Sequence, residues 1–135
     1  MKNKDWISGS TCVYNIGYHF VWSTKYRKQV LQAPIDTRLK QLFQEISKQY
    51  GFTIENEEVM PDHVHLFVVA HPKFAPSILA KLLKGITARR LFQEFPALKN
   101  KLWKGHLWNP SYYVGTAGSV SKEVIQRYIN EQKTT

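Results

Sequence analysis

The sequence predicts an α+β domain whose strands and helices follow one another in the order β-α-β-β-α-β, with one extra helix at the end. Four segments rich in β-branched and aromatic residues, two segments with apolar residues at helical spacing, and the turn residues between them lead to this order. It is the split βαβ arrangement of ferredoxin-like and RRM-like folds, with an antiparallel sheet. The 135 residues suit a single domain over 1–135, and 43% hydrophobic residues suffice for its core.

The first half of the chain supplies two strands and one helix. Residues 1–10 are polar, and we expect them to form a flexible arm. Residues 11–24 predict the first strand, because aromatic and β-branched side chains dominate them. Apolar residues recur at helical spacing over residues 35–50, and Gly51 is a natural C-terminal stop for that helix. Residues 52–60 predict the second strand.

The second half supplies two further strands and two helices. A β-branched run over residues 63–70 predicts the third strand. Proline opens and ends the second helix, which we expect over residues 76–95. Residues 107–116, rich in Trp and Tyr, predict the fourth strand. Residues 119–132 predict a last amphipathic helix.

The charge balance is basic, with 19 Lys plus Arg against 10 Asp plus Glu and a net charge of +9. Such an excess in a small domain favours polyanions. The four Trp, seven Tyr and seven Phe suit stacking on unpaired bases. A merely basic surface is the alternative explanation. The candidates for DNA phosphate contacts are Lys25, Arg27, Lys28, Lys84, Arg89, Arg90, Lys101 and Lys104.

Cysteine content and hydropathy argue against a disulfide-bonded, secreted or membrane-spanning protein. Cys12 is the only cysteine, which excludes an intrachain disulfide and a cysteine zinc cluster. The sequence shows neither a signal peptide nor an apolar run of membrane-spanning length. We therefore expect a soluble, cytoplasmic protein with no membrane partner.

Two histidines stand at the start of the third predicted strand. In a strand, alternate side chains share a face, so His63 and His65 lie together on one face. The opposite face is then wholly apolar, formed by Val64, Leu66, Val68 and Ala70. This is the geometry of a metal site with two histidine ligands, although two structural histidines give the same pattern. His19, on the first strand, and Asp62 are candidate supporting residues.

The last helix carries a tyrosine and an amide four residues apart, Tyr128 and Gln132, on one helix face. Two imidazoles and one amide oxygen can hold a divalent cation and leave positions open for phosphate oxygens. Tyr128 is then a candidate nucleophile, because a phenol with a pKa of about 10 needs less activation than an alcohol. A phosphotyrosine ester keeps the phosphodiester activated, so rejoining DNA needs no ATP.

Four sequence blocks support this interpretation together: VWSTKYR at 21–27, MPDHVH at 60–65, WNPSYYVG at 108–115 and YINEQ at 128–132. In these blocks the chain resembles the single-tyrosine HUH transposases of small bacterial and archaeal insertion sequences, which include REP-associated transposases. HUH denotes histidine, hydrophobe, histidine. The match spans nearly the whole chain, in the order of the family.

The resemblance implies a metal-dependent endonuclease and strand transferase for DNA transposition. It implies that His63, His65 and Gln132 bind Mg²⁺ or Mn²⁺. Tyr128 would become joined to the 5′ phosphate of cleaved single-stranded DNA, and imperfect hairpins near the element's ends would be recognised. It also implies a homodimer whose active site is shared between subunits. Gly115 and Gly118 are hinge candidates for the helix that carries Tyr128, and an ordinary turn is the alternative explanation for these glycines.

Two other functions stay open. A non-catalytic ferredoxin-like protein that binds single-stranded nucleic acid would explain the charge and the aromatic content, but not the histidines and the tyrosine. A zinc-dependent hydrolase would need a carboxylate base beside the metal. Asp62 is the only acid next to the histidines in sequence, and strand alternation predicts that it points away from them.

Overall fold

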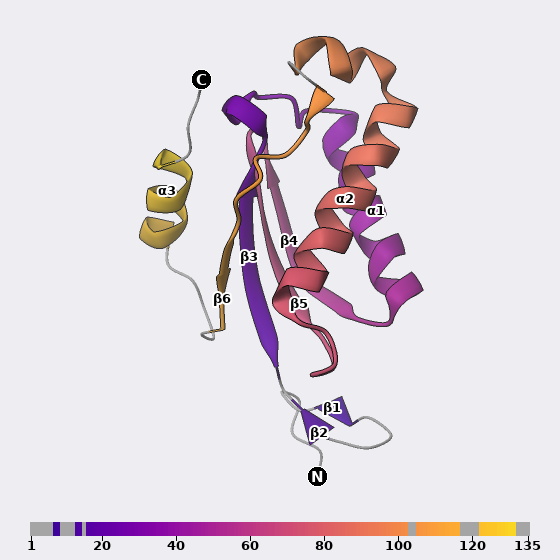
Figure 1. Cartoon of the computed structure of the whole chain (residues 1–135), viewed down its shortest axis with the longest axis vertical. Coiled ribbons are helices and arrows are strands. Elements are labelled where there is room, and N and C mark those ends of the chain that lie inside the picture. Colours follow the sequence, from indigo (N-terminus) through magenta and orange to yellow (C-terminus); the bar gives the residue numbers. More distant parts are fainter. Residues whose placement is uncertain (1–6, 9–12, 15, 103–104, 117–121, 132–135) are drawn as a thin grey trace.

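A four-stranded antiparallel sheet forms the centre of the computed structural model, which describes residues 7–8, 13–14, 16–102, 105–116 and 122–131 (Figure 1). Across the sheet the strands follow the order β4-β5-β3-β6. Their bounds are Gly17–Ser23 for β3, Thr53–Met60 for β4, His63–Val69 for β5 and Tyr113–Gly115 for β6. The helices are α1 (Ile35–Tyr50), α2 (Pro76–Glu94) and α3 (Lys122–Asn130).

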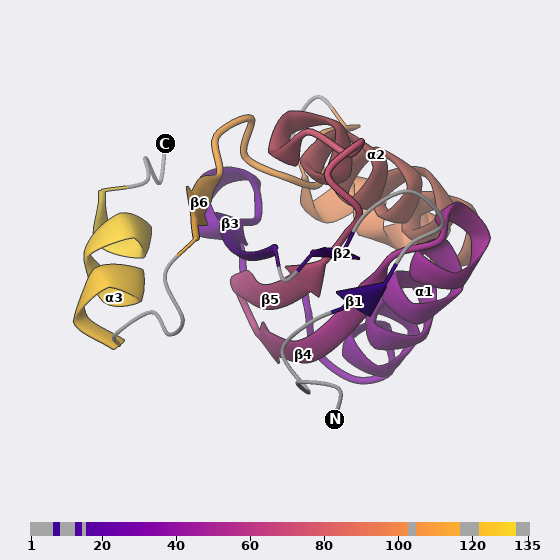
Figure 2. The same ribbon diagram turned by 90° about the horizontal axis from the view of Figure 1, so that it is seen from below.

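The chain order β3-α1-β4-β5-α2-β6, with only antiparallel neighbours, confirms the split βαβ fold class. Helices α1 and α2 lie together on one side of the sheet. Helix α3 lies beyond β6 on the other side, and two perpendicular views agree on this (Figures 1 and 2). The sheet face away from α1 and α2 is therefore only partly covered.

Strand alternation divides the side chains between the two faces as the sequence predicts. Phe20 and Trp22 of β3 are fully buried in the core with Val64, Leu66 and Val68 of β5. The Trp22 ring packs edge-on against Phe43 of α1 and against Trp108. Each such buried side chain contributes roughly 1.5–3 kcal/mol to stability. His19, His63 and His65 belong to the opposite face.

The first strand is shorter than predicted. Strand β3 begins at Gly17, whereas Val13–Tyr14 (β2) pairs with Ile7–Ser8 (β1) as a separate ribbon. Close packing explains why glycine starts β3, because a Cβ atom at Gly17 would lie 2.5 Å from the Phe67 ring. The remainder of the predicted arm, at 1–6 and 9–10, lies outside the described residues.

The fourth strand is also shorter, and its first half is an irregular segment. Trp108 makes only an isolated bridge to Thr24. Pro110 has no N–H for a ladder, and the backbone N–H of Ser111 bonds the side chain of Asn109 at 3.0 Å. The pairing therefore resumes only at Tyr113.

Short 3₁₀ helices complete the fold: η1 (Lys25–Arg27) after β3 and η2 (Pro96–Lys101) after α2. The basic residues Lys99 and Lys101 thus belong to a 3₁₀ helix. In the described part of α3 the helix spans 122–130, and positions 119–121 and 132 of the prediction lie outside the described residues. Among the described helices, none has the length and apolar character needed to span a bilayer.

Candidate active site on the open face of the sheet

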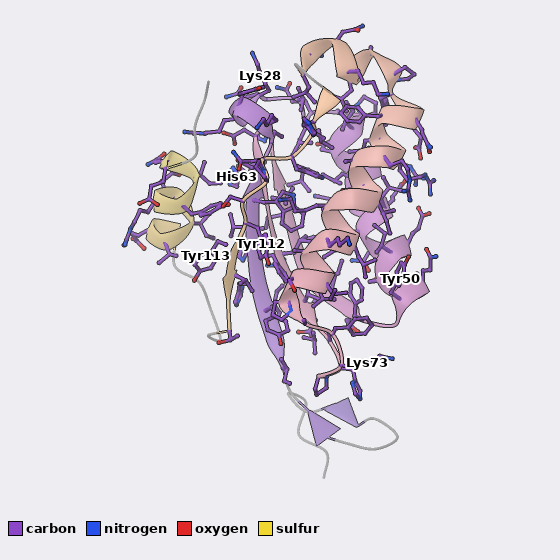
Figure 3. All side chains as sticks on the ribbon, viewed as in Figure 1. Lys28, Tyr50, His63, Lys73, Tyr112 and Tyr113 are labelled. Atoms are coloured by element: carbon purple, nitrogen blue, oxygen red, sulfur yellow. The ribbon has the colours of Figure 1, made fainter. Side chains whose placement is uncertain are left out.

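The register of the central strands places the histidines side by side on the face away from α1 and α2. His63 pairs with Ser23, His65 with Val21, and Phe67 with His19. Cross-strand partners point to the same face, so all six side chains share it. Figure 3 shows His63 on the side of the sheet that α3 occupies. The expected two-histidine edge is thus present.

His63 is held by a carboxylate. Its Nδ1 donates a hydrogen bond to Oδ1 of Asp62 at 2.8 Å, and Arg27 Nε lies 3.4 Å from Oδ2 of the same carboxylate. The expectation that Asp62 points away from the histidines is therefore wrong. Asp62 belongs to the turn before β5, where strand alternation does not apply. With Nδ1 fixed as a donor, Nε2 is the nitrogen that can bind a metal.

His65 faces a second histidine instead. Its Nε2 lies 3.1 Å from Nδ1 of His19, and the two nitrogens share a proton in a buried hydrogen bond. Its Nδ1 is buried without a hydrogen-bond partner, since Glu58 Oε2 is 3.8 Å away, too far for one. Burial, followed by the nearby His19, lowers the pKa of His65 below its usual 6.5. The ring is thus neutral at pH 7, the form in which imidazole binds metals.

Tyr128 is attached to the β6 side of the same face. Its hydroxyl donates a hydrogen bond to Ser111 Oγ at 3.0 Å, and its ring centroid lies 6.2 Å from that of Tyr113. Burial raises the pKa of the phenol, and the bond to Ser111 partly offsets this. Tyr113 pairs with Val21, and Val21 pairs with His65, so these three residues form one row across the sheet. Two strand spacings separate Tyr113 from His65, which is roughly 10 Å.

The donors present suit a divalent cation. His63 offers Nε2, and His65 is a neutral imidazole with one nitrogen that bonds no other group. Among the described residues, no three side chains of His, Cys, Asp or Glu gather around one point. The third predicted ligand, Gln132, lies outside the described residues, so its role stays a prediction.

Comparison with known proteins gives the family. The family model for IS200-like transposases matches residues 12–132. The chain belongs to the IS200-like transposase family. This confirms the resemblance to single-tyrosine transposases.

Several relatives support this membership. The ISDra2 transposase TnpA of Deinococcus radiodurans is 45% identical over 124 residues, which are 92% of this chain and 89% of that protein. The IS200 transposase of Salmonella typhimurium is 29% identical over 119 residues, 88% of this chain and 78% of that protein.

Two solved structures agree with this fold. A crystal structure of a Deinococcus radiodurans R1 protein assigned as a transposase superposes with a TM-score of 0.88 and 43% identity, covering 96% of this chain and 99% of the other. A REP-associated tyrosine transposase bound to a REP hairpin gives a TM-score of 0.57 at 16% identity, over 96% and 71% of the two chains. This second likeness supports the fold alone.

The basic residues proposed for this transposase as DNA contacts differ in their surroundings. Lys84 is used within the protein, because its Nζ donates hydrogen bonds to the carbonyl oxygens of Asn109 at 2.7 Å and Ser111 at 3.1 Å. Arg27 contacts Asp62, and Arg90 pairs with Glu94 at 3.1 Å. Lys104 lies outside the described residues. The remaining described members are exposed or partly exposed: Lys25, Lys28, Arg89 and Lys101.

Sequence reasoning missed two partners in the site. Ser111 receives the Tyr128 hydroxyl, and Ser23 has a buried Oγ without a hydrogen-bond partner in the row of His63. Both fall inside the family blocks at 21–27 and 108–115, which was the available signal. Of the two hinge candidates, Gly115 ends β6 opposite His19, and Gly118 lies outside the described residues.

Proposed function

We propose that this transposase cleaves and rejoins single-stranded DNA at insertion-sequence ends through a covalent 5′-phosphotyrosine at Tyr128. The observation that carries the proposal is the arrangement on the open sheet face. Two imidazoles lie in adjacent rows of that face, one hydrogen-bonded to Asp62 and one to His19, and the Tyr113 ring that Tyr128 contacts lies in the row of His65.

In this proposal each side chain of the site has a separate role. His63 and His65, with Gln132 as third ligand, hold Mg²⁺ or Mn²⁺. The cation, when bound, polarises the scissile phosphodiester as a Lewis acid. Asp62 keeps Nε2 of His63 directed away from the turn by accepting the proton of Nδ1. These residues orient the phosphate that Tyr128 attacks.

In the cleavage step the phenol of Tyr128 loses its proton to solvent and its oxygen bonds to phosphorus. The bond from phosphorus to the 3′ oxygen breaks, and that oxygen takes up a proton to leave as a 3′-hydroxyl. In rejoining, a 3′-hydroxyl attacks the phosphotyrosine and the phenol is regenerated. Burial raises the pKa of Tyr128, and its hydroxyl donates a hydrogen bond to Ser111, so the phenol has to give up this proton before or during attack.

The DNA and the assembly are proposed on related grounds. The net charge of +9 and the aromatic content suit single strands. The structurally similar REP-associated transposase was solved with a REP hairpin, and we propose that this chain also recognises hairpins. Helix α3 touches the sheet mainly through β3, and its Ile129 is buried. We propose that the homodimer shares this helix between subunits, with Gly115 and Gly118 as the hinge.

A denaturing gel tests the proposal. The protein is incubated with Mn²⁺ or Mg²⁺ and labelled single-stranded DNA that carries an element end. We expect a metal-dependent adduct that survives denaturant and is absent in Tyr128→Phe. Tyr50→Phe, on the exposed end of α1, is the matched control and should form the adduct normally.

Two outcomes would contradict the proposal. DNA binding without an adduct, under conditions in which a relative cleaves, would favour a non-catalytic binding protein. Metal-dependent product release that persists in Tyr128→Phe would favour a hydrolase, for which Asp62 is a carboxylate in contact with His63. His63→Ala should abolish the adduct while hairpin binding persists.

A further inference from the structure

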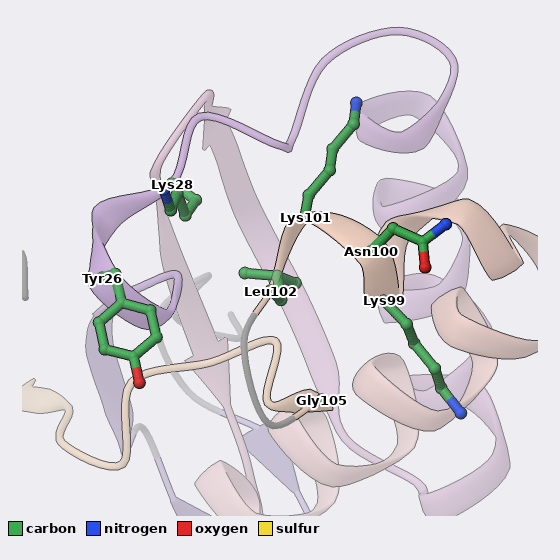
Figure 4. A pocket seen from close by; sticks show the side chains of 7 residues that line it. All are labelled: Tyr26, Lys28, Lys99, Asn100, Lys101, Leu102 and Gly105. Carbon is green, nitrogen blue, oxygen red and sulfur yellow. The ribbon is translucent and has the colours of Figure 1, made fainter.

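A basic pocket opens between η1 and η2, apart from the histidine pair (Figure 4). Its volume is ≈ 480 Å³, within the range of small-ligand sites. The Tyr26 ring stands on the η1 side. The η2 side supplies Asn100 and two lysines, and Leu102 lies between the two sides.

The charge of this pocket has one sign. Lys28, Lys99 and Lys101 line it, and none of its described lining residues is acidic. Lys25 adds a fourth ammonium group, which lies 5.2 Å from the centroid of the Tyr26 ring. An aromatic ring on one side of a pocket and lysines along its lining form a combination that suits single-stranded nucleic acid: the ring can stack on a base, and the cations can contact phosphates.

The backbone that presents the ring is strained. Tyr26 has φ 60° and ψ 16°, and Arg27 has φ 54°, so two consecutive residues other than glycine are left-handed. This conformation costs on the order of 1–3 kcal/mol per residue and persists only where neighbouring contacts enforce it. Here Thr24 enforces it, since its hydroxyl donates to the carbonyl oxygen of Lys28 at 2.7 Å. This hydrogen bond therefore helps to hold Tyr26 at the pocket.

The same turn is fixed to the residues that hold His63. The Thr24 N–H donates to the Asp62 carbonyl oxygen at 2.9 Å, and Arg27 contacts the Asp62 carboxylate. The N–H of Lys25 donates to the carbonyl oxygen of Leu107 at 2.7 Å, which ties η1 to the segment after η2. The pocket is therefore rigidly connected to the end of the sheet at which His63 lies.

We propose that this pocket binds an unpaired nucleotide of the single-stranded DNA, with its base on Tyr26 and its flanking phosphates on the lysines. The inference rests on the proposed function and specifies where the strand runs beyond the histidines. The ammonium groups of Lys99 and Lys101 diverge from η2 (Figure 4). Cations so spread suit the two phosphates on either side of a nucleotide better than one terminal phosphate.

Equilibrium binding of a fluorescent oligothymidylate to the full chain tests this proposal. Binding is measured in EDTA, to prevent cleavage, at several salt concentrations. Lys99→Gln/Lys101→Gln should weaken binding and reduce the salt slope by about 1.4, since each phosphate contact on a single strand contributes about 0.7. Lys48→Gln/Lys81→Gln, two exposed lysines of α1 and α2, is the matched control and should alter neither.

The aromatic arm uses Tyr26→Ala and Tyr26→Phe. Loss of one stacked base predicts about 5- to 150-fold weaker binding for Tyr26→Ala with an unchanged salt slope. Tyr26→Phe keeps the ring and should bind normally, which assigns the loss in Tyr26→Ala to the ring and not to the hydroxyl group. Free thymidine monophosphate should compete only weakly.

Three results decide the matter. Equal salt slopes for the pocket and control lysine pairs would overturn the proposal. Strong competition by free thymidine monophosphate would also overturn it, in favour of a site for a terminal phosphate. The adduct assay of the proposed function is separate: binding that depends on the pocket without any adduct would reject strand transfer and leave the pocket standing.

Discussion

Nδ1 of His19 and Nε2 of His65 lie 3.1 Å apart in a hydrogen bond between two strands. If Nε2 of His65 is the metal ligand, the cation has to displace His19. His19→Leu should then leave a buried nitrogen unpaired and destabilise the metal-free protein by about 1–3 kcal/mol. The same change should tighten Mn²⁺ binding by about 2- to 12-fold, because the cation no longer has to break the hydrogen bond between His19 and His65.

Urea unfolding in EDTA and calorimetric titration with Mn²⁺ measure the two effects. His19→Asn is the matched variant, because its amide nitrogen can replace Nδ1 and should restore both values toward those of the wild type. A His19→Leu variant that binds Mn²⁺ more weakly would show that His19 supports the metal site and does not compete with it.

The Asp62 carboxylate predicts a second effect on metal affinity. Asp62→Asn removes the charge that fixes Nδ1 of His63 as a donor, and it also releases Arg27. Loss of such a partner costs 10- to 100-fold in metal affinity. Titration with Mn²⁺ should show this loss, while Glu55→Gln, an exposed acid on β4, should bind as the wild type. Equal affinities for the two variants would remove Asp62 from the site.

The elements that the sequence predicted well are those with a strong local pattern. Helix α1 was predicted with its observed bounds, because a left-handed Gly51 ends it and an apolar stripe runs along it. The alternation of β5 placed His63 and His65 correctly. These features depend on residues close in sequence, so periodicity alone reveals them.

The contacts that the sequence pattern did not reveal are local exceptions or long-range pairs. Asp62 lies in a turn, where the period-2 rule fails, and its partner Arg27 is 35 residues away. Lys84 is a candidate for DNA phosphate contacts, and nothing in its sequence pattern indicates that it reaches backbone carbonyl groups 25 and 27 residues further on. Only the packing of α2 beside the irregular segment before β6 creates those contacts.

Lys84 predicts a pH dependence of stability. Burial lowers its pKa to about 8 from 10.5. Between these two values the unfolded chain binds a proton that the folded protein does not, so the free energy of unfolding should rise with pH over this range. Below pH 8 both states are protonated, and Lys84 contributes no slope.

Urea unfolding of the wild type and of Lys84→Met, at intervals from pH 7.5 to 10, measures this contribution as the difference between the two curves. The difference cancels the titration of the tyrosines. Lys81→Met, on the exposed face of α2, should follow the wild type. Parallel curves for the wild type and Lys84→Met would show that Lys84 titrates normally.

The bond from the Tyr128 hydroxyl to Ser111 Oγ predicts how the nucleophile is held. Ser111→Ala removes a contact that lowers the pKa of Tyr128 against the effect of burial, so the phenol should titrate at higher pH. If Ser111 only restrains Tyr128 before attack, adduct formation should proceed at least as fast in Ser111→Ala.

The titration is read as the ultraviolet difference between Ser111→Ala and Ser111→Ala/Tyr128→Phe, and the rate from timed denaturing gels. Ser77→Ala, an exposed serine of α2, is the control. A slower adduct with an unchanged pKa would instead assign Ser111 to binding the phosphate.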